Sequence, residues 1–275
     1  MTPELITLND GTRIPQLGFG VYQIPAEDCE RTVREAIDIG YRHFDTAQIY
    51  ENEAEVGRAL AASGIDRSEF FVTTKLWNPW QGRDTTATAF DESLRKLDMD
   101  YVDLFLIHWP MPKRDLYLET WDVMQSFVQD GRARSIGVSN FLVPHLERLL
   151  EHSDHIPSVN QIELHPAHQQ PKLVELCAEK GIAIEAYAPL GQGAYPLLSD
   201  PTITAIADAH GRTPAQTVLR WHLQRGNIIF PKSLTSSRIR ENFAIFDFTL
   251  SDDEVGRITA MECGGRVSHD PNDIN

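Results

Sequence analysis

Four polar side chains in the first half of the chain have the chemistry to move a proton together. Asp45 and Lys75 lie inside apolar segments, where an unpaired charge is costly, so we expect them to form an ion pair. Tyr50 follows Asp45 by five residues, and His108 ends another apolar run. A phenol with a pKa of about 10 is a weak acid at neutral pH. A nearby ammonium lowers that pKa, so Lys75 is expected to make Tyr50 a usable proton donor.

This combination suits the reduction of a carbonyl group. Asp45 would keep Lys75 charged and oriented, and a neutral His108 could donate a hydrogen bond to the carbonyl oxygen. The carbonyl carbon also needs a hydride, which no side chain supplies, so a nicotinamide cofactor is implied. The chemistry needs no metal ion, and the His-x-x-His pairs at 152/155 and 165/168 lack a third ligand. We therefore predict no metal site.

The elements that must bring these residues together are predicted by a regular alternation of apolar and amphipathic segments. Helical spacing of apolar residues recurs between the apolar segments, which is typical of parallel strands joined by right-handed crossovers. Eight strands in about 210 residues favour a closed (β/α)8 TIM barrel over an open sheet. The predicted strands are Leu17–Tyr22, His43–Ala47, Phe71–Leu76, Val102–Trp109, Ser135–Ser139, Ser158–Glu163, Ile182–Ala188 and Ile228–Lys232.

Three segments lie outside this repeat. The turn sequence Asn9-Asp10-Gly11 separates two short runs of strand-forming residues and predicts an N-terminal β-hairpin. The connection from Pro189 to Asn227 holds one predicted helix, Pro214–Gln224, and its length is typical of a lid or ligand clamp. The polar tail Gly264–Asn275 is either a frayed terminus or part of the site wall. No linker divides the chain, so residues 1–275 are predicted to form a single domain.

The composition excludes several classes of protein. A hydrophobic content of 41% allows a large packed core, and a formal net charge of −15 argues against nucleic-acid binding, which needs clustered Lys and Arg. The three cysteines lie far apart, which predicts no disulfide framework and fits a reducing compartment. No apolar run approaches the roughly 20 residues that span a bilayer. We expect a cytoplasmic protein that binds neither nucleic acid nor membrane.

The polar residues gather where a barrel places its reactive groups, at the carboxyl ends of the strands. Each of these residues taken singly is weak support for a functional site, but together they predict one site on this face of the barrel. The residues concerned are Asp45, Lys75 and His108 at the ends of the second, third and fourth predicted strands, Ser139 and Asn140 after the fifth, Gln161 on the sixth, Tyr187 on the seventh and Lys232-Ser233 on the eighth.

Several stretches resemble the signature sequences of the aldo-keto reductase superfamily, in order along essentially the whole chain. Phe44-Asp45-Thr46-Ala47 with Tyr50, Thr74-Lys75-Leu76-Trp77 and Leu106-Ile107-His108-Trp109-Pro110 resemble its catalytic stretches. Gly137-Val138-Ser139-Asn140-Phe141 and Asn160-Gln161-Ile162-Glu163 are similar to its nicotinamide-binding stretches. Ile229-Phe230-Pro231-Lys232-Ser233, followed by Arg238-Ile239 and Glu241-Asn242, resembles its adenosine-phosphate clamp. By its length and by the residues of these stretches the chain looks most similar to the bacterial 2,5-diketo-D-gluconate reductases.

The resemblance implies roles for particular residues. Asp45, Tyr50, Lys75 and His108 would form the catalytic tetrad, with Tyr50 as the acid. Lys232 and Arg238, two cations close together on an acidic protein, favour a 2′-phosphate and hence NADPH/NADP+ over NADH. The implied cofactor-binding residues are Ser139, Asn140, Gln161, Tyr187 (stacked on the nicotinamide ring), Leu190, Gln192, Lys232, Ser233, Leu234, Thr235, Arg238, Glu241 and Asn242.

The predicted substrate is a small carbonyl compound, such as an α-dicarbonyl or a keto-sugar. A largely aromatic pocket wall is expected from Tyr22, Ile49, Trp77 and Trp109, which lie near strand ends on the reactive face. Tyr187 stands where the diketogluconate reductases usually have tryptophan, and Thr235 stands where they have arginine. The resemblance therefore implies the reaction and a monomer, but not a particular sugar acid.

Two other functions remain open at this stage. A redox sensor or structural protein would keep the cofactor site without turning over a carbonyl, although the intact tetrad argues against it. A barrel isomerase or hydrolase would not bind NADPH and would leave Lys232 and Arg238 without a task.

Overall fold

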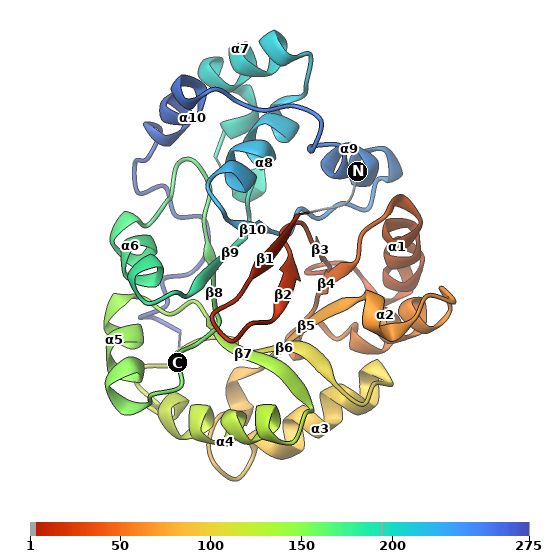
Figure 1. Cartoon of the computed structure of the whole chain (residues 1–275), viewed down its shortest axis with the longest axis vertical. Helices are drawn as coiled ribbons and strands as arrows, with labels where there is room; N and C mark the ends of the chain where they lie inside the picture. The colour runs from red at the N-terminus through yellow and green to blue at the C-terminus, as the bar shows by residue number, and fades with distance from the viewer. Residues whose placement is uncertain (1–3, 194, 275) are drawn as a thin grey trace.

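Eight parallel strands form the centre of the computed structural model, which describes residues 4–193 and 195–274. The strands are β3 (Phe19–Gly20), β4 (His43–Asp45), β5 (Phe71–Leu76), β6 (Val102–Ile107), β7 (Ala133–Ser139), β8 (Val159–Glu163), β9 (Ala183–Tyr187) and β10 (Ile228–Ile229), and they pair in this order. Leu17, just before β3, forms a parallel bridge with Ile229 of β10. The Gly18 amide donates to the Ile229 carbonyl at 2.9 Å, which closes the sheet into the predicted (β/α)8 barrel (Figure 1).

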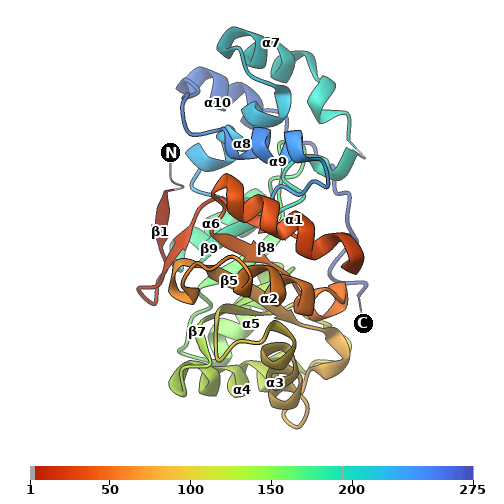
Figure 2. The ribbon, with the colours of Figure 1, turned by 90° about the vertical axis from the view of Figure 1, so that its right-hand side faces the viewer.

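The predicted hairpin covers one end of this barrel. Strands β1 (Leu5–Thr7) and β2 (Arg13–Pro15) pair antiparallel, and Gly11 in the turn has a φ of +88° that favours glycine. Leu8 and Ile14 pack with strand residues such as Leu104 in one buried cluster. Figure 2 shows β1 on one side of the barrel and the C-terminal tail on the other. The amino ends of the strands are thus plugged, and the carboxyl ends face the tail.

Most of the helices form a ring around the barrel (Figure 1). This ring contains α1 (Ala26–Ile39), α2 (Glu53–Ala61), α3 (Thr86–Leu97), α4 (Tyr117–Gln129), α5 (Val143–His152), α6 (Pro171–Glu179), α8 (Pro214–Gln224) and α9 (Ser236–Phe243). Two further helices, α7 (Pro201–His210) and α10 (Asp252–Thr259), pack against α8 farther from the strands. No helix in the described part of the chain is both long and apolar enough to cross a membrane.

The structure differs from the sequence predictions at strand ends and in one helix. β3 and β10 have two residues each, shorter than predicted, and Pro231 lacks the N–H that would extend β10. β6 ends at Ile107 rather than Trp109. Helix α7 lies within the connection where only α8 was predicted. Its start signal is present in the sequence, because Asp200 accepts a hydrogen bond from the Thr202 amide and Pro201 occupies the first turn.

Candidate active site

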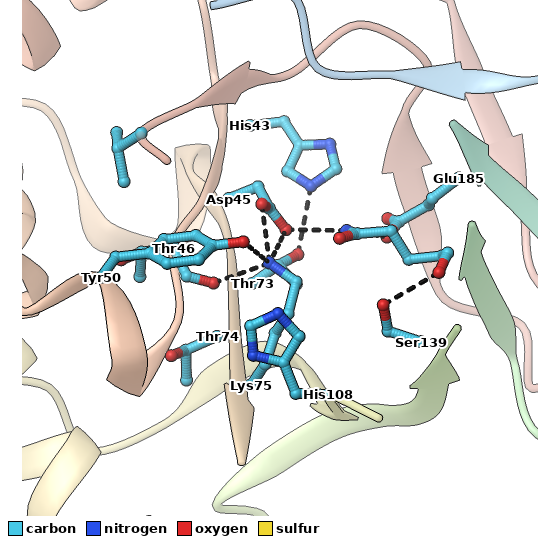
Figure 3. Close-up of polar contacts among 12 residues, drawn as sticks. His43, Asp45, Thr46, Tyr50, Thr73, Thr74, Lys75, His108, Ser139 and Glu185 are labelled. Carbon is cyan, nitrogen blue, oxygen red and sulfur yellow. Dashed lines mark hydrogen bonds and ion pairs between the residues drawn. The ribbon is translucent and has the colours of Figure 1, made fainter. Parts of the chain in front are cut away.

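A buried ion pair lies at the centre of the site (Figure 3). Lys75 is fully buried on β5, and its Nζ lies 2.7 and 2.8 Å from the two carboxylate oxygens of Asp45, the last residue of β4. The same Nζ donates to the Thr46 carbonyl at 2.9 Å. Three acceptors for one ammonium compensate its desolvation. The predicted pair of Asp45 and Lys75 is therefore present.

Tyr50 approaches this pair from the short helical turn η1 (Gln48–Tyr50) that follows β4. Its hydroxyl oxygen lies 3.5 Å from Lys75 Nζ. Burial, and after it the charge of Asp45 and the neighbouring Tyr22, raise the pKa of Tyr50 well above its usual value. The prediction that Lys75 lowers this pKa is therefore wrong for this arrangement. The physical reason is that burial disfavours the charged phenolate, and the Asp45 carboxylate nearby disfavours it further.

His108 lies beside Tyr50 just after β6, with the two ring centres 5.8 Å apart. Burial, and after it the charge of Lys75, lower the pKa of His108 well below its usual value, so the ring is neutral as predicted. Its Nδ1 is buried and has no hydrogen-bond partner among the described residues. Because burial closes Nδ1 to a ligand, Nε2 is the ring nitrogen that we expect a substrate to contact.

The four residues predicted to hold the nicotinamide form one hydrogen-bonded group, which Gln161 joins through its backbone carbonyl. Asn140 Nδ2 donates to the His108 carbonyl at 2.9 Å and to Ser139 Oγ at 3.1 Å, and Ser139 Oγ donates to the Gln161 carbonyl at 2.9 Å. The Tyr187 hydroxyl donates to Asn140 Oδ1 at 2.7 Å. The structure thus brings Ser139, Asn140 and Tyr187 together beside His108.

Gln161 is bound to a residue that the sequence predictions did not include. Its Nε2 donates to Asp45 Oδ2 and to Glu185 Oε2, each at 2.8 Å. Both N–H groups of this amide are therefore held by carboxyl oxygens, and Oε1 has no protein donor among the described residues. Glu185 lies inside β9 and is fully buried.

The C-terminal tail packs against the site. Of the two predictions for the tail, a frayed terminus or part of the site wall, the structure shows the second. Glu163, at the end of β8, accepts hydrogen bonds from the amides of Val267 and Ser268 at 2.6 and 2.8 Å and from the Ser268 hydroxyl. Burial alone would raise the pKa of Glu163, but these bonds and one from His165 lower it to about 2. Ser268 Oγ also lies 2.9 Å from the Tyr187 hydroxyl. Glu163 thus ties the tail to the predicted nicotinamide site.

The residues predicted to hold the adenosine end lie on the loop after β10 and on α9. Burial lowers the pKa of Lys232, and neither Lys232 nor Arg238 forms an ion pair within the described ranges. Ser233 Oγ accepts from the Thr235 amide at 3.0 Å, and Glu241 accepts from Thr213 at 2.7 Å. The remaining predicted members are Leu190, which is half-buried, Gln192 and Leu234, which are exposed, and Asn242, which is buried.

The predicted pocket residues surround Tyr50 and His108. The Tyr22 ring centre lies 5.0 Å from that of Tyr50, and the Trp77 and Trp109 ring centres lie 5.5 and 6.4 Å from that of His108. Ile49 precedes Tyr50 and is among the exposed large apolar residues. Three of the four predicted pocket residues are therefore aromatic side chains close to Tyr50 or His108.

Glu163, Glu185 and Ser268 take part in the site but were absent from the sequence predictions. For Glu163 and Glu185 a signal existed, because both are acidic residues inside predicted apolar strands, as Asp45 is. Ser268 gave no such signal. His165 and His168, the second of the two His-x-x-His pairs, are buried, and they belong to no group of three potential metal ligands in the described part of the chain.

Comparisons with known proteins agree with this geometry. The family model described as the aldo/keto reductase family matches residues 16–262. An aldo-keto reductase of Mycolicibacterium smegmatis is 52% identical over 275 residues, which are 100% of this chain and 99% of that protein. The methylglyoxal reductase DkgA of Yersinia pestis is 48% identical over 267 residues, 97% of this chain and 96% of that protein.

A solved structure shows the same fold with a cofactor. A mutant of Gox0644 in complex with NADPH superposes with a TM-score of 0.95 at 44% identity, covering 100% of each chain. The resemblance seen in the sequence is therefore confirmed, together with the prediction of an NADP-dependent oxidoreductase. This chain belongs to the aldo/keto reductase family.

Proposed function

We propose that the chain reduces small aldehydes and ketones with NADPH and that Tyr50 donates the proton to the carbonyl oxygen. The observation that carries the proposal is the 3.5 Å approach of the Tyr50 hydroxyl to Lys75 Nζ, beside a neutral His108. The raised pKa keeps Tyr50 protonated at neutral pH, which is the state that a donor needs.

Lys75 and His108 complete the proton transfer. As the proton leaves Tyr50, negative charge grows on its oxygen, and the ammonium of Lys75 stabilises that charge. Asp45 and the Thr46 carbonyl hold the ammonium in place. His108 Nε2 donates a hydrogen bond to the substrate oxygen and orients it toward the phenol. Because the site is buried, these charges act in a medium of low polarity, where they are strong.

The residues on the rim fit the cofactor. A partly desolvated Lys232 and an unpaired Arg238 suit a phosphate, and Gln161 Oε1 suits the N–H of a carboxamide. Ser139, Asn140 and the Tyr187 ring would complete the nicotinamide site, and Leu190, Gln192, Ser233, Leu234, Thr235, Glu241 and Asn242 would contact the remainder. When bound, NADPH supplies the hydride for the carbonyl carbon. Asn140 Oδ1 accepts one hydrogen bond from the Tyr187 hydroxyl and has a second lone pair for a donor of the cofactor.

The substrate class follows from the pocket and from the relatives. Tyr22, Ile49, Trp77 and Trp109 provide an apolar wall for a small molecule, with Tyr50 and His108 at its base. The methylglyoxal reductase relative favours an α-dicarbonyl as substrate, and keto-sugars belong to the same proposal. A monomer in the cytoplasm remains the prediction from the sequence.

The test is NADPH oxidation by the purified protein against methylglyoxal, an aromatic aldehyde and 2,5-diketogluconate, with NADH in parallel. Tyr50→Phe is expected to lower kcat by about 10²–10⁴-fold, the usual contribution of a general acid. Fluorescence titration should show NADPH binding unchanged. Tyr101→Phe serves as the matched control, because Tyr101 precedes β6 at the opposite end of the barrel.

Two results would contradict the proposal. Retained turnover in Tyr50→Phe would reject Tyr50 as the acid. No oxidation of NADPH with any carbonyl, despite tight binding, would favour the sensor or structural function.

A further inference from the structure

A second buried carboxyl group lies in the barrel beneath the catalytic ion pair. Glu185 comes from the middle of β9, is fully buried and faces the barrel interior on the side of Asp45 (Figure 3). Its Oε2 accepts one hydrogen bond, from Gln161 Nε2 at 2.8 Å. Its Oε1 is buried and has no partner among the described residues. An apolar side chain would fill this position without such a cost, so packing alone does not explain a glutamate here.

Glu185 is connected to Tyr50 by an unbroken series of polar contacts. Gln161 Nε2 donates both to Glu185 and to Asp45 Oδ2, so one amide nitrogen joins the two carboxyl groups. Asp45 then binds Lys75, and Lys75 Nζ lies 3.5 Å from the Tyr50 hydroxyl. Glu185 is therefore joined to Tyr50 through Gln161, Asp45 and Lys75.

The charges around Glu185 favour its neutral form. The charged groups that face it are Asp45 on β4 and Lys75 on β5, while neighbouring β10 provides only Ile228 and Ile229. Among the described residues Lys75 is the one cation that acts on Glu185, and Asp45 already binds it through both oxygens. An ionised Glu185 would add an uncompensated negative charge to a dry interior. Burial first, and then the charge of Asp45, raise the pKa of Glu185 to about 8.

We propose that Glu185 is a positioning residue whose protonated carboxyl group, acting through Gln161, aligns the Asp45–Lys75 pair with Tyr50, and whose ionisation slows carbonyl reduction. The inference rests on the proposed function, in which Tyr50 is the proton donor. An ionised Glu185 places a second negative charge near the phenol oxygen. That charge opposes the negative charge that develops on Tyr50 as the proton leaves, so the reaction slows at alkaline pH.

Glu185→Gln provides the test, with Glu53→Gln as the matched control. Glutamine is neutral at every pH and still offers an oxygen to Gln161. Glu53, on α2, is also a buried glutamate with one bound oxygen and one without a partner, and burial raises its pKa, but its bound oxygen contacts Thr74 instead of Gln161. Two readouts are needed: kcat as a function of pH with saturating NADPH and substrate, and the infrared carbonyl band of a protonated carboxyl group in the cofactor-free protein.

The wild type is expected to lose about tenfold in kcat between pH 7 and pH 9, as one ionisation near pH 8 dictates. Its infrared carbonyl band should fade over the same range. Glu53→Gln should keep both transitions. Glu185→Gln should lower kcat at pH 7 by about threefold, leave the Kd for NADPH unchanged and lose both transitions near pH 8.

Other outcomes overturn the inference. An unchanged transition in Glu185→Gln would show that another group titrates. A uniform loss of kcat at all pH values, with the profile retained, would show that Glu185 acts only on packing. If the wild type reduces no carbonyl, the proposed function fails, whereas the infrared band still decides whether Glu185 is protonated, and its absence at pH 7 rejects the inference separately.

Discussion

At the amino ends of its strands the barrel is closed by the apolar hairpin and by a buried Asp103 that is bound to Arg67 and Arg134, whereas at the carboxyl ends the buried pair of Asp45 and Lys75 lies beside Tyr50. The hairpin inserts Leu8 and Ile14 against strand residues, and its turn is fixed by Asp10, which accepts hydrogen bonds from Ser135 and Ser158 at 2.6 and 2.7 Å. The Asp10 carboxylate is thus bound by the hydroxyl groups of two serines. These bonds hold the hairpin to the amino ends of the strands, so we expect this end to contribute mainly to stability.

The opposite end retains groups that its own hydrogen bonds leave free. His108 Nδ1 and Glu185 Oε1 are buried without partners among the described residues. Such groups lower stability, and they are typical of sites that bind or react. The comparison predicts that substitutions at the amino ends change the free energy of unfolding, whereas those at the carboxyl ends change turnover or binding.

The substitution expected to have the largest effect is Lys75→Met, which should lower both turnover and stability and so depart from the pattern of separate effects at the two ends. It removes the ammonium that stabilises the Tyr50 oxygen and leaves the Asp45 carboxylate buried without its cation. We expect kcat to fall by about 10²–10⁴-fold and the free energy of unfolding to fall by about 3–5 kcal/mol. Denaturant unfolding and steady-state kinetics measure the two losses.

The double substitution Asp45→Asn with Lys75→Met is the control for that experiment. It removes both charges, so it should recover most of the lost stability and none of the lost turnover. If the double variant is as unstable as the single one, the unpaired carboxylate is not the cause.

A loss of stability alone is expected from Ile14→Ala in the hairpin. Ile14 is fully buried against the strands, so its truncation leaves a cavity and should cost about 2–4 kcal/mol of unfolding free energy. The kcat should not change under conditions where the variant is folded. Leu5→Ala, at an exposed position of the same hairpin, should cost much less. A fall in kcat for Ile14→Ala would contradict the independence of the two ends.

The sequence predicts the barrel well because its signals are local and repeated. Apolar segments at regular intervals indicate the strands, and Asn9-Asp10-Gly11 indicates the hairpin that the structure contains. Charges inside apolar segments indicate Asp45 and Lys75, which the structure pairs. Glu185 is likewise an acidic residue inside an apolar strand, β9, so the sequence contains the same signal for it.

Other features depend on distances that no sequence pattern contains. The direction of the pKa shift of Tyr50 depends first on how deeply the phenol is buried and then on its distance from Asp45, and only the folded arrangement decides both. The docking of the tail depends on Glu163, which lies 105 residues from Ser268 in the chain. The composition of the tail shows only that it is polar and does not indicate which residue it binds.

The smallest effect is expected at the edge of the reactive end, from Arg238→Ala on α9. Arg238 is exposed and has no ion pair within the described ranges, so its loss should leave the free energy of unfolding unchanged. If it binds a 2′-phosphate, its removal should raise the Kd for NADPH by about tenfold, the equivalent of one charge-assisted hydrogen bond of about 1.4 kcal/mol, and leave the Kd for NADH unchanged. Arg240→Ala is the matched control, because Arg240 is an exposed arginine of the same helix, two residues along the chain. Two arginines of one helix contribute similarly to a long-range electric field. If both variants weaken NADPH binding equally, the general positive charge of α9 attracts the cofactor, and a direct contact by Arg238 does not.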